Sequence, residues 1–207
     1  MHRRPTARLF VAVDPPPYVC EQLASWARAA LRSAGRGGGE QARVLDAELL
    51  HVTLCFLGNR AAEEIEPLAA RLAACRGPVG ELSVGAPLWL PPRRPRALAV
   101  ELHDERDLLA ELQKSVLTAC GDPSEEHSDA AAVRDARAAK HRRFRPHVTV
   151  ARLRAGVDRR SKGSGGIERA LPPTPALSFV PSELILYRSW LAPEGASYEA
   201  LASHPIA

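Results

Sequence analysis

Two short stretches of this chain, HVTLCFLG at residues 51–58 and HVTVARLR at residues 147–154, share the pattern His-x-Thr-x in an apolar context. In a β-strand, side chains two positions apart point to the same face of the sheet. Each stretch therefore predicts a strand that presents an imidazole and a hydroxyl on one face. The valine between the histidine and the threonine would point to the other face, toward a core.

The segments around these two stretches predict an α+β fold with largely antiparallel sheets. Strands come in pairs or threes with helices between them, rather than in the regular β-α-β repeats of a doubly wound fold. The expected strands are 8–14, 43–45, 50–58, 81–86, 96–102, 144–154, 176–180, 182–190 and 197–201. The expected helices begin at the prolines 15–17, lie around 65–72, and run from a cap at Asp104 to Gly121.

Each His-Thr strand follows a strand and a helix, which indicates an internal duplication about a pseudo-twofold axis. We therefore expect one domain over residues 1–207 with two pseudo-symmetric lobes and an active-site groove between them. A charged segment at about 122–143, poor in large apolar residues, is expected to be an exposed insertion.

The composition is that of a globular protein, with 45% hydrophobic residues, 25% charged residues and a net charge of +4. No run of about 18 apolar residues occurs, so we expect no transmembrane helix. The N-terminal segment lacks the apolar core of a secretory signal. The four cysteines form no CxxC pair and are expected to be reduced, buried thiols, which favours a cytoplasmic location.

The paired motifs are suited to phosphodiester hydrolysis if the two strands lie side by side about the pseudo-twofold axis. One neutral imidazole can accept a proton from water, while the other, protonated, donates a proton to the leaving oxygen. Histidine fits both roles because its unperturbed pKa of about 6.5 leaves both forms accessible near neutral pH. Each proton transfer typically contributes on the order of 10²–10⁴-fold to the rate. Hydroxyls and arginines can hold the phosphate oxygens.

Other kinds of site have less support in the sequence. A single His-x-Thr on an apolar strand is usually structural, but two copies in the same context favour a functional site. A metal would need a third or fourth ligand, and the other histidines show no HxH, HxD or HExxH spacing, so no metal or cofactor is expected. No GxSxG elbow supports a serine nucleophile. The arginines between Arg142 and Arg154 suit phosphate, although a solvated basic face would look the same.

A family resemblance is carried by five segments in order along the chain, RLFVAVD, LHVTLCFLG, PRRPRALAVEL, FRPHVTVARLR and LILYRSWLAPEGASYEAL. They resemble segments of the bacterial and archaeal RNA 2′,3′-cyclic phosphodiesterases of the two-histidine (2H) phosphoesterase superfamily, also called 2′-5′ RNA ligase-like proteins. The resemblance covers nearly the whole chain. It implies two similar α+β lobes around a groove that holds both motifs, and no metal.

By this resemblance, His51 is the proton donor, His147 is the proton acceptor, and Thr53 and Thr149 bind the phosphate. The implied reaction opens a terminal 2′,3′-cyclic phosphate, on RNA 3′ ends or small nucleotides, to a 2′-phosphomonoester, and we expect a monomer. RNA 2′-5′ end-joining and RNA-end binding without catalysis stay open as alternatives. Arg152 matches a family arginine, but a regular strand would point it away from His147, so substrate contact needs a bulge or a strand end.

Overall fold

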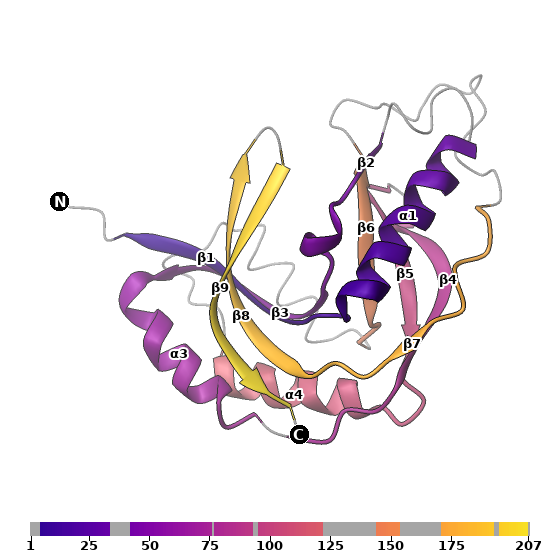
Figure 1. Ribbon diagram of the computed structural model, residues 1–207. Coiled ribbons are helices and arrows are strands. Elements are labelled where there is room, and N and C mark those ends of the chain that lie inside the picture. The colour runs from indigo at the N-terminus through magenta and orange to yellow at the C-terminus, as the bar shows by residue number, and fades with distance from the viewer. Residues whose placement is uncertain are drawn as a thin grey trace.

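The computed structural model of the chain describes residues 5–33, 42–75, 77–92, 95–121, 144–153, 171–192 and 195–206 (Figure 1). The insertion expected at 122–143, with Arg142 and Arg143, lies outside these ranges, as does the basic segment from Arg154 onward to residue 170. Among the described residues, no helix combines the length and the apolar character needed to cross a membrane.

The described strands form one nine-stranded sheet in which the pairings are antiparallel. The strands are β1 (Thr6–Val13), β2 (Ala42–Val44), β3 (Val52–Ala61), β4 (Leu82–Leu90), β5 (Ala97–His103), β6 (His147–Leu153), β7 (Ser178–Phe179), β8 (Glu183–Ala192) and β9 (Gly195–Pro205). Their order is β7-β4-β5-β6-β3-β1-β8-β9, and β2 pairs with β6. The predicted α+β fold with antiparallel strands is confirmed.

Three α-helices and two short 3₁₀ helices complete the described structure. They are α1 (Pro17–Ser33), η1 (Ala47–Leu49), η2 (Ala62–Glu64), α3 (Ile65–Leu72) and α4 (Leu108–Cys120). Asp104 caps α4 as expected, since its carboxylate accepts the backbone N–H groups of residues 108–110. All four cysteines are free and buried, as the sequence predicts.

The two motif strands, β3 and β6, lie at the centre of the sheet and divide it into halves. The first half consists of β3, β1, β8 and β9, and the second of β6, β5, β4 and β7, with β2 on β6. Among the described residues, the ladder between the halves is a single residue pair, Val52–Val148. The two motifs therefore meet where the halves join.

Helices α1 and α4 each pack against the half of the sheet that does not contain the strand before them in the sequence. Helix α1 follows β1 along the chain but packs against β6 and β2, whereas α4 follows β5 but packs against β3 and α3. Figure 1 shows α1 beside β6, and α3 with α4 together on the other side of the molecule. The units β1-α1-β3 and β5-α4-β6 thus repeat the same crossing, which agrees with an internal duplication.

Strand β9 is longer than the predicted segment 197–201. Its length follows from its pairing with β8 and not from a pattern in its own sequence. It pairs with β8 from Ala192–Gly195 to Glu183–Pro205. Its side chains are mostly exposed or half-buried, so it carries little of the apolar alternation by which a strand is recognised. Strand β4 likewise extends to Leu90 beside β5, beyond the expected end at residue 86.

Candidate active site

The pairing of β3 with β6 brings both motifs onto one face of the sheet. Val52 and Val148 are directly opposite and fully buried, so they point to the core. In an antiparallel pair, the neighbours of this position face each other across the strands, so the register places His51 beside Thr149 and His147 beside Thr53. All four of these side chains are half-buried. The structure therefore gathers two imidazoles and two hydroxyls on one face of the sheet, which we call the groove face.

Both histidines are oriented by the same local bond. His51 Nδ1 lies 2.9 Å from the carbonyl oxygen of Leu49, and His147 Nδ1 lies 2.8 Å from that of Arg145. A carbonyl oxygen only accepts hydrogen bonds, so Nδ1 carries a proton in each ring. In the neutral form Nε2 is then the basic nitrogen, which leaves it to exchange a proton with a substrate.

Both motif strands carry a β-bulge at the same distance from the histidine. The extra residue is Leu54 in β3 and Val150 in β6, each three positions after its histidine. The flanking pairs are Val11–Cys55 and Ala12–Thr53 around the first, and Leu98–Ala151 and Ala99–Thr149 around the second. A bulge reverses the alternation of side chains. It turns Phe56 and Arg152, each five positions after a histidine, to the groove face.

The bulge in β6 accounts for the place of Arg152. Val150 and Ala151 are both fully buried although they are consecutive, and Arg152 is exposed. The positive charge of Arg152 acts on His51, where it helps to lower the pKa of the imidazole. Arg152 therefore lies near His51, which a regular strand would not allow.

Aromatic rings surround His51 but come from strands far away in the sequence. The centroid of the His51 ring lies 4.8 Å from that of Phe10 and 5.2 Å, edge-on, from that of Tyr198. Tyr187 stacks on Phe10 at 5.1 Å. Sequence reasoning missed these residues because they reach the motif only through the pairing of β1 with β3 and β8 and of β8 with β9.

These rings change the acid–base behaviour of His51. Burial is the main cause that lowers the pKa of His51 to about 4; the hydrogen bond to Leu49 opposes this shift, and the positive charges of Arg152 and His147 add to it. In the free protein at neutral pH, His51 is therefore a neutral imidazole.

A buried bond fixes the aromatic cluster. The hydroxyl of Tyr187 donates a hydrogen bond of 2.5 Å to Oδ2 of Asp14, the residue that follows β1. Burial raises the pKa of the Asp14 carboxyl, and burial together with Asp14 raises the pKa of the Tyr187 hydroxyl. The bond holds the Tyr187 ring against Phe10 and, through Phe10, supports His51.

The positions five residues after each motif histidine differ in chemistry. Phe56 is 55% exposed and contacts Phe10 with ring centroids 6.2 Å apart. The equivalent position after the second motif is the cation Arg152. In the part of the chain that the structure describes, no cluster of three or more His, Cys, Asp or Glu side chains could hold a metal ion.

Solved structures share the fold over almost the whole chain. Escherichia coli LigT complexed with 3′-AMP matches with a TM-score of 0.70 and 24% identity, covering 98% of this chain and 99% of LigT. TT0787 of Thermus thermophilus matches with a TM-score of 0.70 and 26% identity, covering 96% of this chain and 97% of that protein. The MHV ns2 PDE domain matches with a TM-score of 0.51 and 13% identity, covering 89% and 99%. No curated protein sequence matched.

The family model described as the 2′-5′ RNA ligase superfamily matches residues 15–189, which include both motifs. Because this match spans most of the chain, and because the fold and the paired motifs agree with it, the chain belongs to the 2′-5′ RNA ligase superfamily of 2H phosphoesterases.

Proposed function

We propose that this protein is a metal-independent RNA 2′,3′-cyclic phosphodiesterase that opens a terminal cyclic phosphate to a 2′-phosphomonoester. The observation that carries the proposal is the equivalent placement of His51 and His147. Each ring is held through Nδ1 by a carbonyl two residues before it, and both rings lie on the groove face where the halves meet. This is the arrangement that an acid and a base on opposite sides of one phosphate require.

In the proposed mechanism, His147 accepts a proton from the attacking water through Nε2. His51 donates a proton to the leaving O3′, which departs on the opposite side of the phosphorus atom. Thr53, Thr149 and Arg152 hold the non-bridging oxygens as charge develops on them. The bond from water oxygen to phosphorus forms as the bond from phosphorus to O3′ breaks.

The low pKa of His51 determines when it gains its proton. Neutral in the free protein at pH 7, it has to be protonated to act as the donor. A phosphodiester anion bound beside the ring favours the imidazolium form and offsets the effects of burial and of the nearby cations. In this scheme, substrate binding and protonation of His51 are linked.

The proposed substrates are RNA 3′ ends and small nucleotides that carry a 2′,3′-cyclic phosphate. The exposed ring of Phe56 offers a face on which a base can stack, and such stacking is worth about 1–3 kcal/mol. Crystal structures of E. coli LigT with 3′-AMP, ATP and NADP⁺ support a groove that takes nucleotides. Because one chain supplies both histidines, we propose that the monomer is active. We also propose that the chain forms one domain and that the protein is located in the cytoplasm.

The second candidate is RNA 2′-5′ end-joining, which the name of the matched family favours. Joining a cyclic phosphate to a 5′-hydroxyl uses the same two proton transfers, with an RNA oxygen in place of water. An assay with a cyclic-phosphate end and a 5′-hydroxyl acceptor separates the two candidates, because end-joining yields a longer RNA.

Hydrolysis of a nucleoside 2′,3′-cyclic phosphate in excess EDTA tests the proposal. We expect full activity, since the groove supplies an acid and a base without a metal, and a product that co-elutes with the 2′-monophosphate. Activity lost in EDTA and regained with Zn²⁺ or Mn²⁺ would contradict the metal-independent mechanism. A 3′-monophosphate would show that the ribose binds reversed or that the histidines exchange roles.

A further inference from the structure

We propose that Gln113 is a positioning residue, which holds the bulge of the first motif strand and thereby keeps Thr53 and Phe56 on the groove face. The inference goes beyond the proposed reaction but rests on it where activity is measured. It starts from the carbonyl group of the bulged residue, because a bulge interrupts the ladder and leaves backbone groups without their usual partner. A buried carbonyl without a partner is costly.

In the second motif, a backbone group satisfies this carbonyl. The oxygen of Val150, the bulged residue of β6, accepts a hydrogen bond of 2.9 Å from the N–H of Leu45. Leu45 directly follows β2, which pairs with β6. The short strand β2 thus brings the donor, and any residue other than proline at position 45 would leave the N–H in place.

In the first motif, a side chain donates the corresponding hydrogen bond. The oxygen of Leu54, the bulged residue of β3, accepts a hydrogen bond of 3.4 Å from Nε2 of Gln113 in α4. Leu54 and Val150 hold the same position relative to their histidines. The two bulges are therefore equivalent, but only the first depends on the identity of a side chain.

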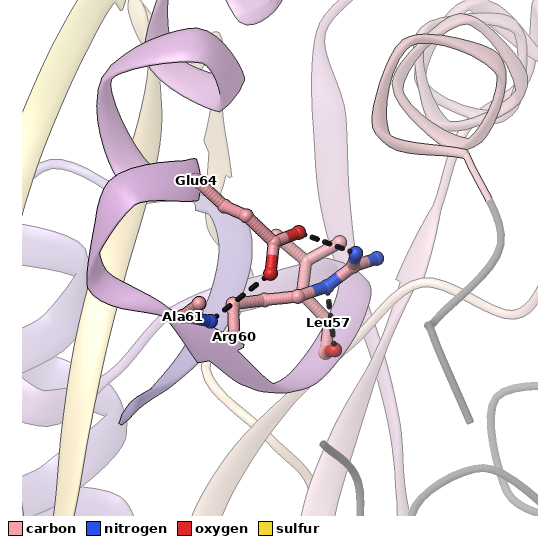
Figure 2. A network of polar contacts seen from close by, with 4 residues as sticks. All are labelled: Leu57, Arg60, Ala61 and Glu64. Atoms are coloured by element: carbon pink, nitrogen blue, oxygen red, sulfur yellow. Dashed lines mark hydrogen bonds and ion pairs between the residues drawn. The ribbon is translucent and has the colours of Figure 1, made fainter. Parts of the chain in front are cut away.

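A third bulge in the motif strands follows the same pattern. The residue Leu57 is the extra one between the pairs Leu9–Gly58 and Phe10–Phe56. Its carbonyl accepts a hydrogen bond of 3.3 Å from Nε of Arg60 (Figure 2). All three bulged carbonyls thus have a donor, which supports a structural need for the bond from Gln113.

The surroundings of Gln113 also point to this role. It is 8% exposed and lies on the face of α4 that packs against β3. The other buried residues of this face are Leu109, Leu112, Val116 and Cys120. An apolar residue at position 113 would suit such a face, whereas a buried amide is costly unless it forms hydrogen bonds.

Loss of the bond should affect substrate binding more than proton transfer. The bulge lies after Thr53, so a shift of Leu54 moves Thr53 and Phe56 directly. His51 lies before the bulge and keeps its own bond to Leu49. The expected result is a higher KM with little change in kcat.

The test compares Gln113→Met, which keeps the length but removes the donor, with Val116→Ala, which shortens a fully buried side chain on the same helix. For Gln113→Met we expect KM for a nucleoside 2′,3′-cyclic phosphate, and Kd for adenosine 2′-monophosphate, to rise by several-fold and at most about 10-fold, because the free energy of one buried hydrogen bond limits the effect on binding. We expect kcat to change less than about 3-fold. Val116→Ala should lower Tm and leave KM and Kd unchanged.

Unchanged KM and Kd in a folded Gln113→Met protein would overturn the proposal. If the wild-type protein hydrolyses no cyclic phosphate, the proposed function fails, while the Kd comparison still tests Gln113. If Gln113→Met does not fold, NMR of the wild-type protein decides. The side-chain amide protons of Gln113 should exchange with solvent at least about 10-fold more slowly than those of the exposed Gln22, and equal rates would overturn the proposal.

Discussion

His51 and His147 occupy equivalent positions in the two motif strands but have different surroundings. Both lie in the same motif with the same valine and threonine, so the sequence predicts equivalent roles on one face. The structure adds the difference between them. Phe10 and Tyr198 pack against His51, and its pKa falls to about 4. No sequence pattern near residue 51 predicts this low pKa, because Tyr198 lies in β9, far from His51 along the chain.

The protonation of His51 can be measured by NMR titration of its Cε1–H signal, assigned by its loss in His51→Gln. In the free protein we expect a pKa of about 4, and a higher value with adenosine 2′-monophosphate bound. A free-protein pKa near 6.5 would contradict the effect of burial.

The same shift should appear in stability. Between pH 6.5 and pH 4 the unfolded state binds the proton more readily than the folded state. The free energy of unfolding should therefore be highest above pH 6.5 and fall by up to about 3 kcal/mol as the pH approaches 4. In His51→Gln, this part of the pH dependence should be missing from urea unfolding curves.

Phe56 marks the end of the groove where a base is proposed to stack. Replacing its ring by Phe56→Ala should weaken binding of a nucleotide by about 10-fold or more and leave binding of inorganic phosphate unchanged, since only the nucleotide has a base. Isothermal titration with both ligands checks this. Tyr18→Ala is a suitable control, because Tyr18 is similarly exposed but lies in α1. Equal losses for both ligands would place Phe56 outside the base site.

At the scale of elements, the motif strands were predictable and their bulges were not. Alternation over HVTL and HVTV identifies both strands, but it is then broken by two adjacent apolar residues, Leu54–Cys55 and Val150–Ala151. In retrospect these doublets are the sign of a bulge, since both residues of each pair are buried. From sequence alone, the same doublets also fit the end of a strand, so the orientation of Arg152 could not be decided.

The end of β3 is joined to the start of α3 by a compact polar network. Glu64 accepts hydrogen bonds of 3.0 Å from the Ala61 N–H through Oε1 and from Arg60 Nη1 through Oε2 (Figure 2). The Arg60 side chain is 6% exposed and that of Glu64 33% exposed. Arg60 also holds the carbonyl of Leu57, so the network links the helix to a bulge near the groove.

Breaking this network should destabilise the fold. Glu64→Ala removes a carboxylate that pairs with a buried guanidinium, and we expect the free energy of unfolding to fall by about 1–3 kcal/mol. This is below the usual cost of breaking a fully buried pair, because water partly screens Glu64. Denaturant unfolding measures the loss, with Glu66→Ala, an exposed carboxylate in the first turn of α3, as the control. Equal losses of unfolding free energy in Glu64→Ala and Glu66→Ala would show that the ion pair does not stabilise the fold.

At the scale of the whole molecule, the duplication predicted from two motifs agrees with the repeated β-α-β crossing. The sequence did not reveal that α1 and α4 each pack on the other half of the sheet, because the pattern of an amphipathic helix shows which face is buried but not which half of the sheet covers it. It also did not reveal that β8 and β9 complete the half that begins with β1. These long-range pairings supply Tyr187 and Tyr198 and make the two halves chemically unequal around equivalent histidines.

The rate at which single variants hydrolyse a nucleoside 2′,3′-cyclic phosphate shows whether His51 and His147 act as one acid–base pair. We predict that His51→Ala and His147→Ala each lower kcat by at least about 10²-fold while circular dichroism and Tm show a folded protein. Thr53→Val and Thr149→Val should have smaller effects, mainly on KM. Near-wild-type kcat in either folded histidine variant would contradict the account.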